Sequence, residues 1–186
     1  MIQQNFIRML EKSLRDNWDY PAFTDYKGQG YHYKDVARRI EKLHMVFEKC
    51  GIKKGDKIAL IGRNSSNWAM TYLAVVTYGA VIVPILPDFH PQDIHHIVNH
   101  SDSLLLFTSD AIYENLDESD MKGLKSIFSL SDFSVIQERK CKGLSETVNQ
   151  LDDLFLEKFK DGFEKDDVKY PEIPNGKLAE ISYTSG

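Results

Sequence analysis

The sequence predicts an α/β fold built on a mainly parallel sheet with helices on both faces. Three observations support this prediction. Short apolar runs alternate with helix-like segments between residues 57 and 108, which is the order that parallel βαβ units require. The runs "KIALI", "VIVPI" and "LLLF" are continuously apolar, as expected for strands covered on both faces. Helix-start and helix-stop residues separate the runs, so each segment has defined ends.

The chain begins with a predicted amphipathic helix over residues 5–18. Its apolar side chains fall at helical spacing on one face: Phe6, Leu10, Leu14 and Trp18, with Ile7 and Met9 alongside. A small hairpin is expected next, since Gly28 and Gly30 separate two aromatic-rich flanks. A second helix follows over residues 35–50, with Gly51 placed as its left-handed cap.

The central segments alternate strand and helix. Strand Ile58–Ile61 leads to "NSS", which offers three candidate N-caps for a helix ending near Gly79. Strand "VIVPI" follows, and the next helix begins near Pro91, a residue that suits the first helical position. Strand "LLLF", a weaker helix over residues 111–116 and strand "SIFSL" complete this part.

The last part of the chain is less regular. Four apolar residues recur at helical spacing, namely Val148, Leu151, Phe155 and Phe159. A final strand is predicted over residues 178–183, because Leu178, Ile181 and Tyr183 follow the linker-like stretch "YPEIPNG".

Composition limits the class of protein. The chain has 186 residues, 42% of them hydrophobic and 27% charged, with a net charge of −5, which is ordinary for one globular domain. The sequence lacks the basic stripe that would indicate nucleic-acid binding. The longest nearly apolar stretch, residues 72–86, is interrupted by Gly79 and Pro84 and is short for a transmembrane segment. Cys50 and Cys141 lack metal-ligand spacing and no secretory signal is present, which favours a reduced cytoplasmic protein.

Two patterns in the middle of the chain are weak candidates for chemistry. His96 and His100 lie four residues apart on one predicted helix face, as in zinc sites, but no glutamate or third ligand accompanies them. Solvated histidines are therefore favoured. The segment "GRNSSNW" opens a helix after a strand, where anions can bind. Capping of that helix by Asn64 and Ser65 is favoured instead, because no glycine-rich nucleotide motif is present.

The end of the chain offers a third pattern, "ISYTSG". Thr184, Ser185 and Gly186 follow a predicted strand, and such loops hold phosphate because backbone N–H groups and hydroxyls donate to its oxygens. The same residues also make ordinary turns. On this string alone, a turn is the favoured interpretation.

Taken in order, several segments resemble the adenylate-forming (AMP-binding) superfamily, the acyl-CoA synthetases and their relatives. "GYHYKDVARRI" is similar to the family's L-T-Y-x-E-L start. Residues 50–85 resemble its next block, a G-[IV]-x-x-G-D-x-[VI] turn, an N-[SR]-x-x-[WF] helix start and a G-A-x-x-[VA]-P-[LI] strand. "YTSG" resembles the first half of its phosphate loop, Y-T-S-G-T-T-G-x-P-K-G. Asp35, His32 and Asn67 depart from the family pattern without touching the chemistry, which leaves the subfamily open.

The resemblance implies that residues 1–186 are one α/β domain, the N-terminal part of a larger acyl-CoA ligase cut within its phosphate loop. Such an enzyme reacts a carboxylic acid with ATP to form an acyl-adenylate. The motifs of this chain are most similar to those of the long-chain fatty acid ligases, which implies a long-chain fatty acid as the substrate. Coenzyme A then displaces AMP, and Mg²⁺ offsets the charge of the triphosphate. Only Thr184, Ser185 and Gly186 match positions that the family uses on ATP. No catalytic residue and no metal ligand is assigned, and these residues alone are expected to be inactive.

The resemblance also implies the partners, which are a fatty acid or other carboxylic acid, ATP, coenzyme A and the remainder of the chain. Neither nucleic acid nor a transmembrane segment is expected. Two alternatives stay open. One is an adenylating enzyme for another acid or for a carrier-protein acceptor. The other is a non-catalytic α/β ligand-binding module.

Overall fold

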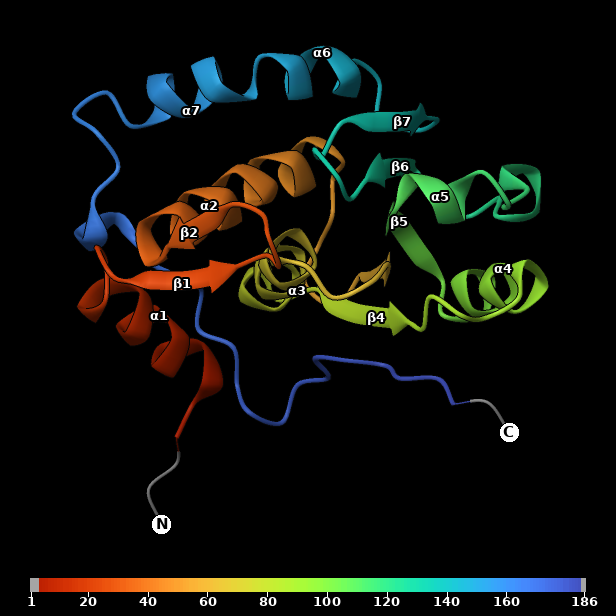
Figure 1. The fold of residues 1–186 in the computed structure, drawn as a ribbon, viewed down its shortest axis with the longest axis horizontal. Helices are drawn as coiled ribbons and strands as arrows, with labels where there is room; N and C mark the ends of the chain where they lie inside the picture. The colour runs from red at the N-terminus through yellow and green to blue at the C-terminus, as the bar shows by residue number, and fades with distance from the viewer. Residues whose placement is uncertain (1–3, 185–186) are drawn as a thin grey trace.

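The computed structural model describes residues 4–184 and shows a sheet covered on both faces by helices (Figure 1). Five strands form this sheet in the order β4-β3-β5-β6-β7. They are β3 (Lys57–Ile61), β4 (Val81–Ile85), β5 (Ser103–Thr108), β6 (Ser126–Ser129) and β7 (Val135–Glu138). The first four run parallel, and β7 pairs antiparallel with β6. The predicted mainly parallel α/β fold is confirmed, and β7 adds a strand that the sequence patterns did not predict.

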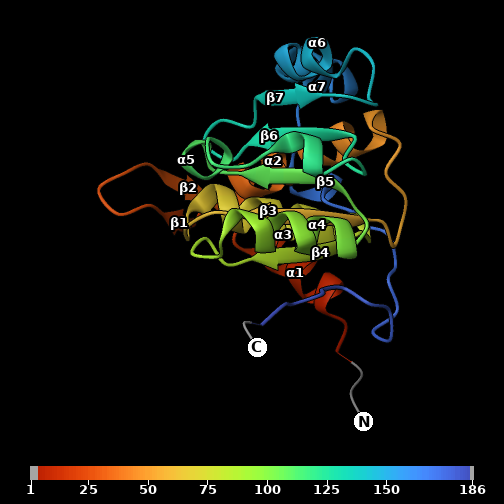
Figure 2. The same ribbon diagram turned by 90° about the vertical axis from the view of Figure 1, so that its right-hand side faces the viewer.

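The helices and a small hairpin surround this sheet. The helices are α1 (Phe6–Asp16), α2 (Tyr33–Lys49), α3 (Ser66–Tyr78), α4 (Pro91–His100), α5 (Asp110–Tyr113), α6 (Leu144–Asn149) and α7 (Leu151–Lys158), with 3-10 turns at Glu118–Asp120 and Lys165–Asp167. The hairpin joins β1 (Pro21–Thr24) to β2 (Gly30–His32) as predicted. It projects beyond the body of the sheet in the side view (Figure 2).

Two separate apolar cores fill the two faces, because successive residues of each strand point to opposite sides. In β3, Ile58 and Leu60 belong to the first core, whereas Ala59 and Ile61 belong to the second. Helices α1, α2, α3, α6 and α7 cover the first core. Helix α4 covers the second with Ile94, Ile97 and Val98.

Local sequence signals set the ends of the central helices. Ser65 caps α3, since its side-chain oxygen accepts the Trp68 N–H at 3.1 Å. Helix α3 ends at Gly79, whose φ of +86° is a left-handed conformation that favours glycine. Pro91 occupies the first turn of α4 as predicted. Gly51 follows α2 with a φ of +62°, also as predicted.

A long irregular segment carries the chain from α7 back across the molecule. We call residues 168–184 the strap. It runs from beside α1, below the sheet in Figure 1, to the described end of the chain (Figure 1). The strand predicted over residues 178–183 is wrong in this part, because the strap forms only one isolated parallel bridge, Ile82 with Glu180, at the open edge of β4.

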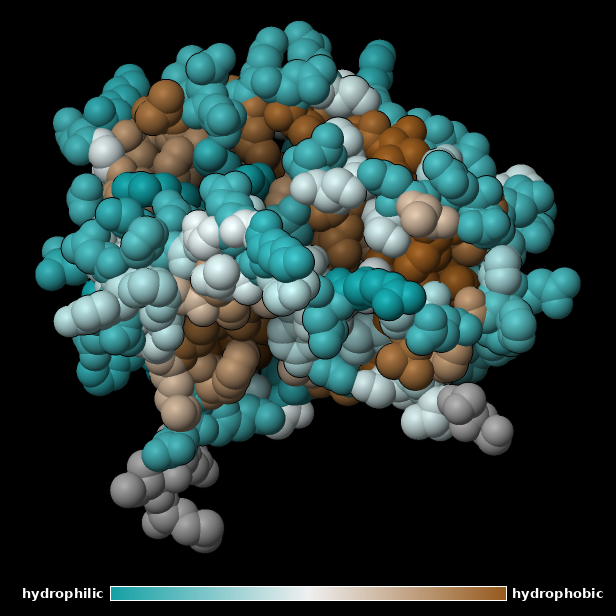
Figure 3. Space-filling view, viewed as in Figure 1, coloured by the Kyte–Doolittle hydropathy of each residue, from teal (hydrophilic) through white to brown (hydrophobic). Residues whose placement is uncertain are grey.

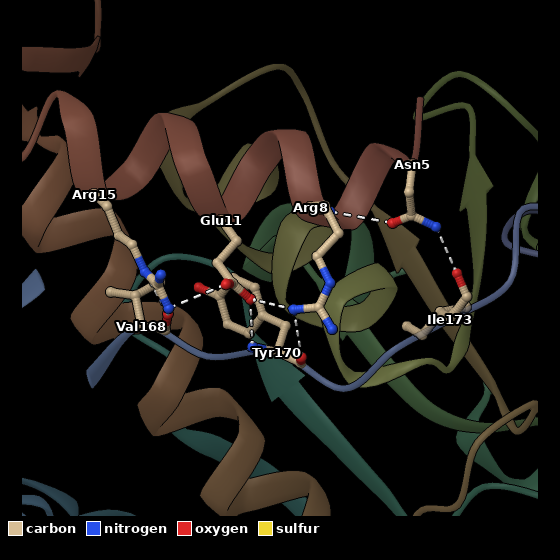
Figure 4. Close-up of polar contacts among 7 residues, drawn as sticks. All are labelled: Asn5, Arg8, Glu11, Arg15, Val168, Tyr170 and Ile173. Carbon is tan, nitrogen blue, oxygen red and sulfur yellow. Dashed lines mark hydrogen bonds and ion pairs between the residues drawn. The ribbon is translucent and has the colours of Figure 1, made fainter. Parts of the chain in front are cut away.

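Helix α1 holds the beginning of the strap through a buried carboxylate (Figure 4). Glu11 is only 8% exposed, and its carboxylate accepts the Tyr170 N–H at 2.9 Å. Arg8 and Arg15 flank it at 2.9 and 3.0 Å. Arg15 also donates to the Val168 carbonyl. The inner face predicted for this helix is corrected accordingly. The buried residues of α1 are Ile7, Glu11 and Leu14, Trp18 is buried just beyond its end, and Phe6 and Met9 are exposed.

Candidate functional site

A cleft of about 560 Å³ opens where the parallel strands end. The loops that follow β3, β4, β5 and β6 all contribute to it, together with Asp25 from the hairpin. Strands β3 and β5 are neighbours in the sheet. The chain goes from β3 to β4 on one side of this pair, and from β5 to β6 on the other side. Open α/β sheets bind ligands at such a switch point, because the diverging loops leave a crevice. Brown apolar residues are visible in hollows between teal ones on the face shown in Figure 3.

The first turn of α3 faces this cleft but already holds an anion from the protein itself. Asp25 accepts the Ser66 N–H through its Oδ1 at 2.8 Å. The Asn67 amide donates to the carbonyls of Leu130 and Ser131 at 2.9 and 2.8 Å. Capping by Ser65 is confirmed, whereas Asn64 is exposed and lines the cleft. The helix N-terminus is therefore occupied by Asp25, which counts against a phosphate site at "GRNSSNW".

Residues of both charges line the cleft. Arg63 is exposed, and Asp88 lies on the loop after β4. Behind the cleft, the Asp110 carboxylate accepts the hydroxyls of Ser129 and Ser131 at 2.7 and 3.0 Å. The cleft can thus position a polar ligand, and among the described residues no histidine or cysteine lines it.

The end of the strap lies over a second cavity, of about 580 Å³, beside α4. Tyr183 and Thr184 line it from the strap, and His90, Asp93 and His96 line it from α4 and the residue before that helix. Thr184 is exposed and lines this cavity. Ser185 and Gly186, the other two residues of the predicted phosphate site, lie outside the described residues.

The histidines of α4 contact protein groups. The rings of His96 and His100 lie 5.5 Å apart, and His100 Nδ1 is 2.7 Å from the Tyr183 hydroxyl. Residues 4–184 contain no group of three or more His, Cys, Asp or Glu side chains that could hold a metal ion. His96 and His100 are exposed, as expected, whereas the neighbouring His95 is 9% exposed and accepts the Asp117 N–H at 3.0 Å through Nε2.

A tyrosine and a carboxylate anchor the strap shortly before this cavity. The Tyr72 hydroxyl of α3 donates to the Glu180 carboxylate at 2.6 Å. Burial, together with this carboxylate, raises the pKa of Tyr72 to about 12, so the phenol keeps its proton at neutral pH. Sequence patterns singled out His100 only as half of a possible metal pair and did not reveal Tyr72 or Glu11, because each acts through a contact with a segment far away in the sequence.

Comparisons with known proteins agree with this architecture. The family model described as "AMP-binding enzyme" matches residues 10–186. Surfactin synthase subunit 2 of Bacillus subtilis is 30% identical over 105 residues, 56% of this chain and 3% of its own. Long-chain-fatty-acid–CoA ligase 6 of Rattus norvegicus is 25% identical over 168 residues, 85% of this chain and 23% of its own. The chain therefore spans less than a quarter of each of these relatives.

A solved structure shares the fold. The crystal structure of the anthranilate CoA ligase AuaEII, in complex with anthranoyl-AMP, superposes with a TM-score of 0.74 at 15% sequence identity. The match covers 98% of this chain and 32% of that enzyme. At this identity the likeness concerns the fold alone. No helix among residues 4–184 is long and apolar enough to cross a membrane.

Proposed function

The chain belongs to the AMP-binding enzyme family, and we propose that it is the N-terminal part of an enzyme that activates a carboxylic acid with ATP. In the proposed reaction the acid carboxylate attacks the α-phosphate of ATP, which forms an acyl-adenylate and releases pyrophosphate. Coenzyme A thiol then attacks the acyl carbon, which releases AMP and gives acyl-CoA. The family match over residues 10–186 is the observation that carries this proposal.

We propose a long-chain fatty acid as the substrate. The resemblance of residues 50–85 to the fatty acid ligases supports this choice. The rat relative, named a long-chain-fatty-acid–CoA ligase, aligns over 85% of the chain and supports it as well. We also propose a cytoplasmic location. The two cysteines are free thiols, and a reducing compartment such as the cytoplasm keeps thiols in this state.

Within this proposal the chain's own residues bind and orient ATP. Thr184, Ser185 and Gly186 donate hydrogen bonds to the β- and γ-phosphates. The exposed Thr184 hydroxyl at the lip of the second cavity fits this role. Mg²⁺ enters with ATP and offsets the charge of its phosphates. We assign it no protein ligand, because residues 4–184 lack a suitable cluster.

ATP–pyrophosphate exchange by the full-length protein tests this function. We expect exchange that depends on a long-chain fatty acid, and little with short acids or amino acids. Thr184→Ala is expected to lower kcat/KM for ATP about 10- to 100-fold, since a lost donor to a charged oxygen costs about this much. Ser145→Ala removes an exposed hydroxyl on α6, far along the chain, and serves as the control.

Two other outcomes favour the alternatives. Exchange that depends on an amino acid or a short acid, without release of AMP on adding coenzyme A, favours a different acid or a carrier-protein acceptor. The 30% identity to the surfactin synthase subunit supports that alternative. A folded full-length protein without exchange for any acid favours the non-catalytic ligand-binding module.

A further inference from the structure

The strap loses its backbone anchorage to the sheet just before Thr184. Ile82 donates to the Ala179 carbonyl at 2.9 Å, and Ile181 donates to the Ile82 carbonyl at 3.0 Å. In a parallel ladder the next donor along β4 is residue 84, and Pro84 has no N–H. The preceding donor, Ala80, is already bonded to the Val75 carbonyl at 3.1 Å as part of the end of α3. No N–H of β4 is therefore left to extend the ladder, which consists of one bridge.

A side-chain contact takes over where the ladder stops. The Tyr183 hydroxyl lies 2.7 Å from His100 Nδ1, and the two rings meet edge to face at 5.8 Å and 86°. Burial and the nearby Asp102 carboxylate raise the pKa of Tyr183, so the phenol stays protonated. It donates a hydrogen bond to Nδ1 in the His100 tautomer that carries its proton on Nε2. Among the described residues, this is the last polar anchor of the strap before Thr184.

We propose that His100 is a positioning residue for the ATP phosphate site, and that it acts by fixing Tyr183 and with it the backbone of Thr184. This inference rests on the proposed role of Thr184, Ser185 and Gly186 in binding phosphate. A loop that binds phosphate through backbone N–H groups must hold these groups in one arrangement. With Pro84 breaking the ladder, helix α4 provides that constraint through His100.

The proposed role predicts which kinetic constant changes. His100 reaches the site only through the strap, so its loss should weaken ATP binding while the KM for the acid stays the same. One hydrogen bond is worth about five- to tenfold in an equilibrium constant. We expect the KM for ATP to rise by this factor in His100→Phe, which keeps an aromatic ring but lacks the acceptor.

The experiment uses the full-length protein and a set of matched variants. His100→Phe and Tyr183→Phe should raise the KM for ATP equally, and the double variant should be no worse than either one, since both remove the same bond. His100→Asn returns an acceptor near the position of Nδ1 and should restore most of the affinity. Gln92→Phe places the same new ring at an exposed position of α4 and should leave the KM unchanged.

A second readout separates this inference from the proposed function. The rise in melting temperature on adding ATP reports nucleotide binding without turnover. If the wild type responds to ATP and His100→Phe responds equally, with a KM within twofold, the positioning role is wrong and the proposed function stands. A parallel rise in the KM for the acid would also overturn the role, because it indicates general disruption. If the wild type neither exchanges nor responds to ATP, both proposals fail.

Discussion

His44 is a titratable side chain that the fold keeps neutral inside the first core. Its side chain is 10% exposed, and its Nε2 lies 3.0 Å from both the Ala74 carbonyl and the Thr77 hydroxyl. Burial lowers the pKa of His44 to about 4. An unfolded histidine titrates near pH 6.5. Between these two values the unfolded chain binds a proton that the folded protein does not.

This difference predicts a loss of stability in acid. The contribution of His44 is complete above pH 6.5 and falls as the pH drops to about 4, where it levels off. The loss is on the order of 3 kcal/mol, at about 1.4 kcal/mol for each pH unit between the two pKa values. Denaturant unfolding at several pH values gives the free energy of unfolding as a function of pH. Its slope between about pH 4 and 6.5 should be shallower in His44→Gln, which keeps a donor but cannot titrate. An unchanged slope would contradict the assignment, and the exposed His90→Gln is the control.

At the scale of elements, the turn between α3 and β4 depends on one glycine. Gly79 has a φ of +86°, and a Cβ there would lie 3.2 Å from Lys54 Cγ and 3.3 Å from Ile173 Cδ1. The turn sets where β4 begins, and Ile173 belongs to the strap. A side chain at this position would thus strain the backbone and push on two neighbouring segments at once.

We expect Gly79→Ala to lower the free energy of unfolding by about 1–2 kcal/mol, the usual cost of a left-handed non-glycine residue. Two controls separate the causes. Gly55 has a φ of +87°, and a Cβ added there would meet nothing within 4 Å, so Gly55→Ala reports the backbone cost alone. A Cβ on Gly176 meets nothing within 4 Å, and this residue has no positive φ, so Gly176→Ala should be neutral. Equal effects of all three variants would argue against this explanation.

At the scale of the whole molecule, the contact between α1 and the strap ties the two ends of the described chain together (Figure 4). Residues 11 and 170 are 159 positions apart in sequence. Asn5 adds a second link, because its amide donates to the Ile173 carbonyl at 2.7 Å. The position of the strap, and so of Thr184, depends on a helix at the other end of the sequence.

Removing the carboxylate of Glu11 should therefore destabilise the whole fold. Glu11→Ala leaves the buried Tyr170 N–H without its acceptor, which typically costs about 1–3 kcal/mol. The side chains of Arg8 and Arg15 are 49% and 32% exposed, so water replaces much of their lost pairing. Lys12→Ala breaks an exposed pair with Asp16 on the same helix and should cost less than about 0.5 kcal/mol. Equilibrium unfolding in urea compares the two. A similar small loss in both variants would show that the buried carboxylate contributes little.

The elements that could be predicted from the amino acids alone are those whose signals are local. Strands β3, β4 and β5 follow from continuous apolar runs, and the ends of α3 and α4 follow from Ser65, Gly79 and Pro91. These signals depend on neighbours within a few residues, so they are readable without the fold. The order of the motifs was likewise enough to indicate the AMP-binding family, to which the chain belongs.

The way in which the strap is held depends on the folded chain. A strand pattern over residues 178–183 could not reveal that the strap pairs with β4 only at Ile82. The Ala80 N–H is already bonded within the end of α3, and Pro84 has no N–H to offer. Nor could a helical pattern show that Glu11 faces inward, since its partner Tyr170 lies at the far end of the sequence. Local patterns report which conformations a segment favours. The partners of a hydrogen-bonding group depend on which distant segments the packed core brings within about 3 Å of it, and packing settles that only when the chain is folded.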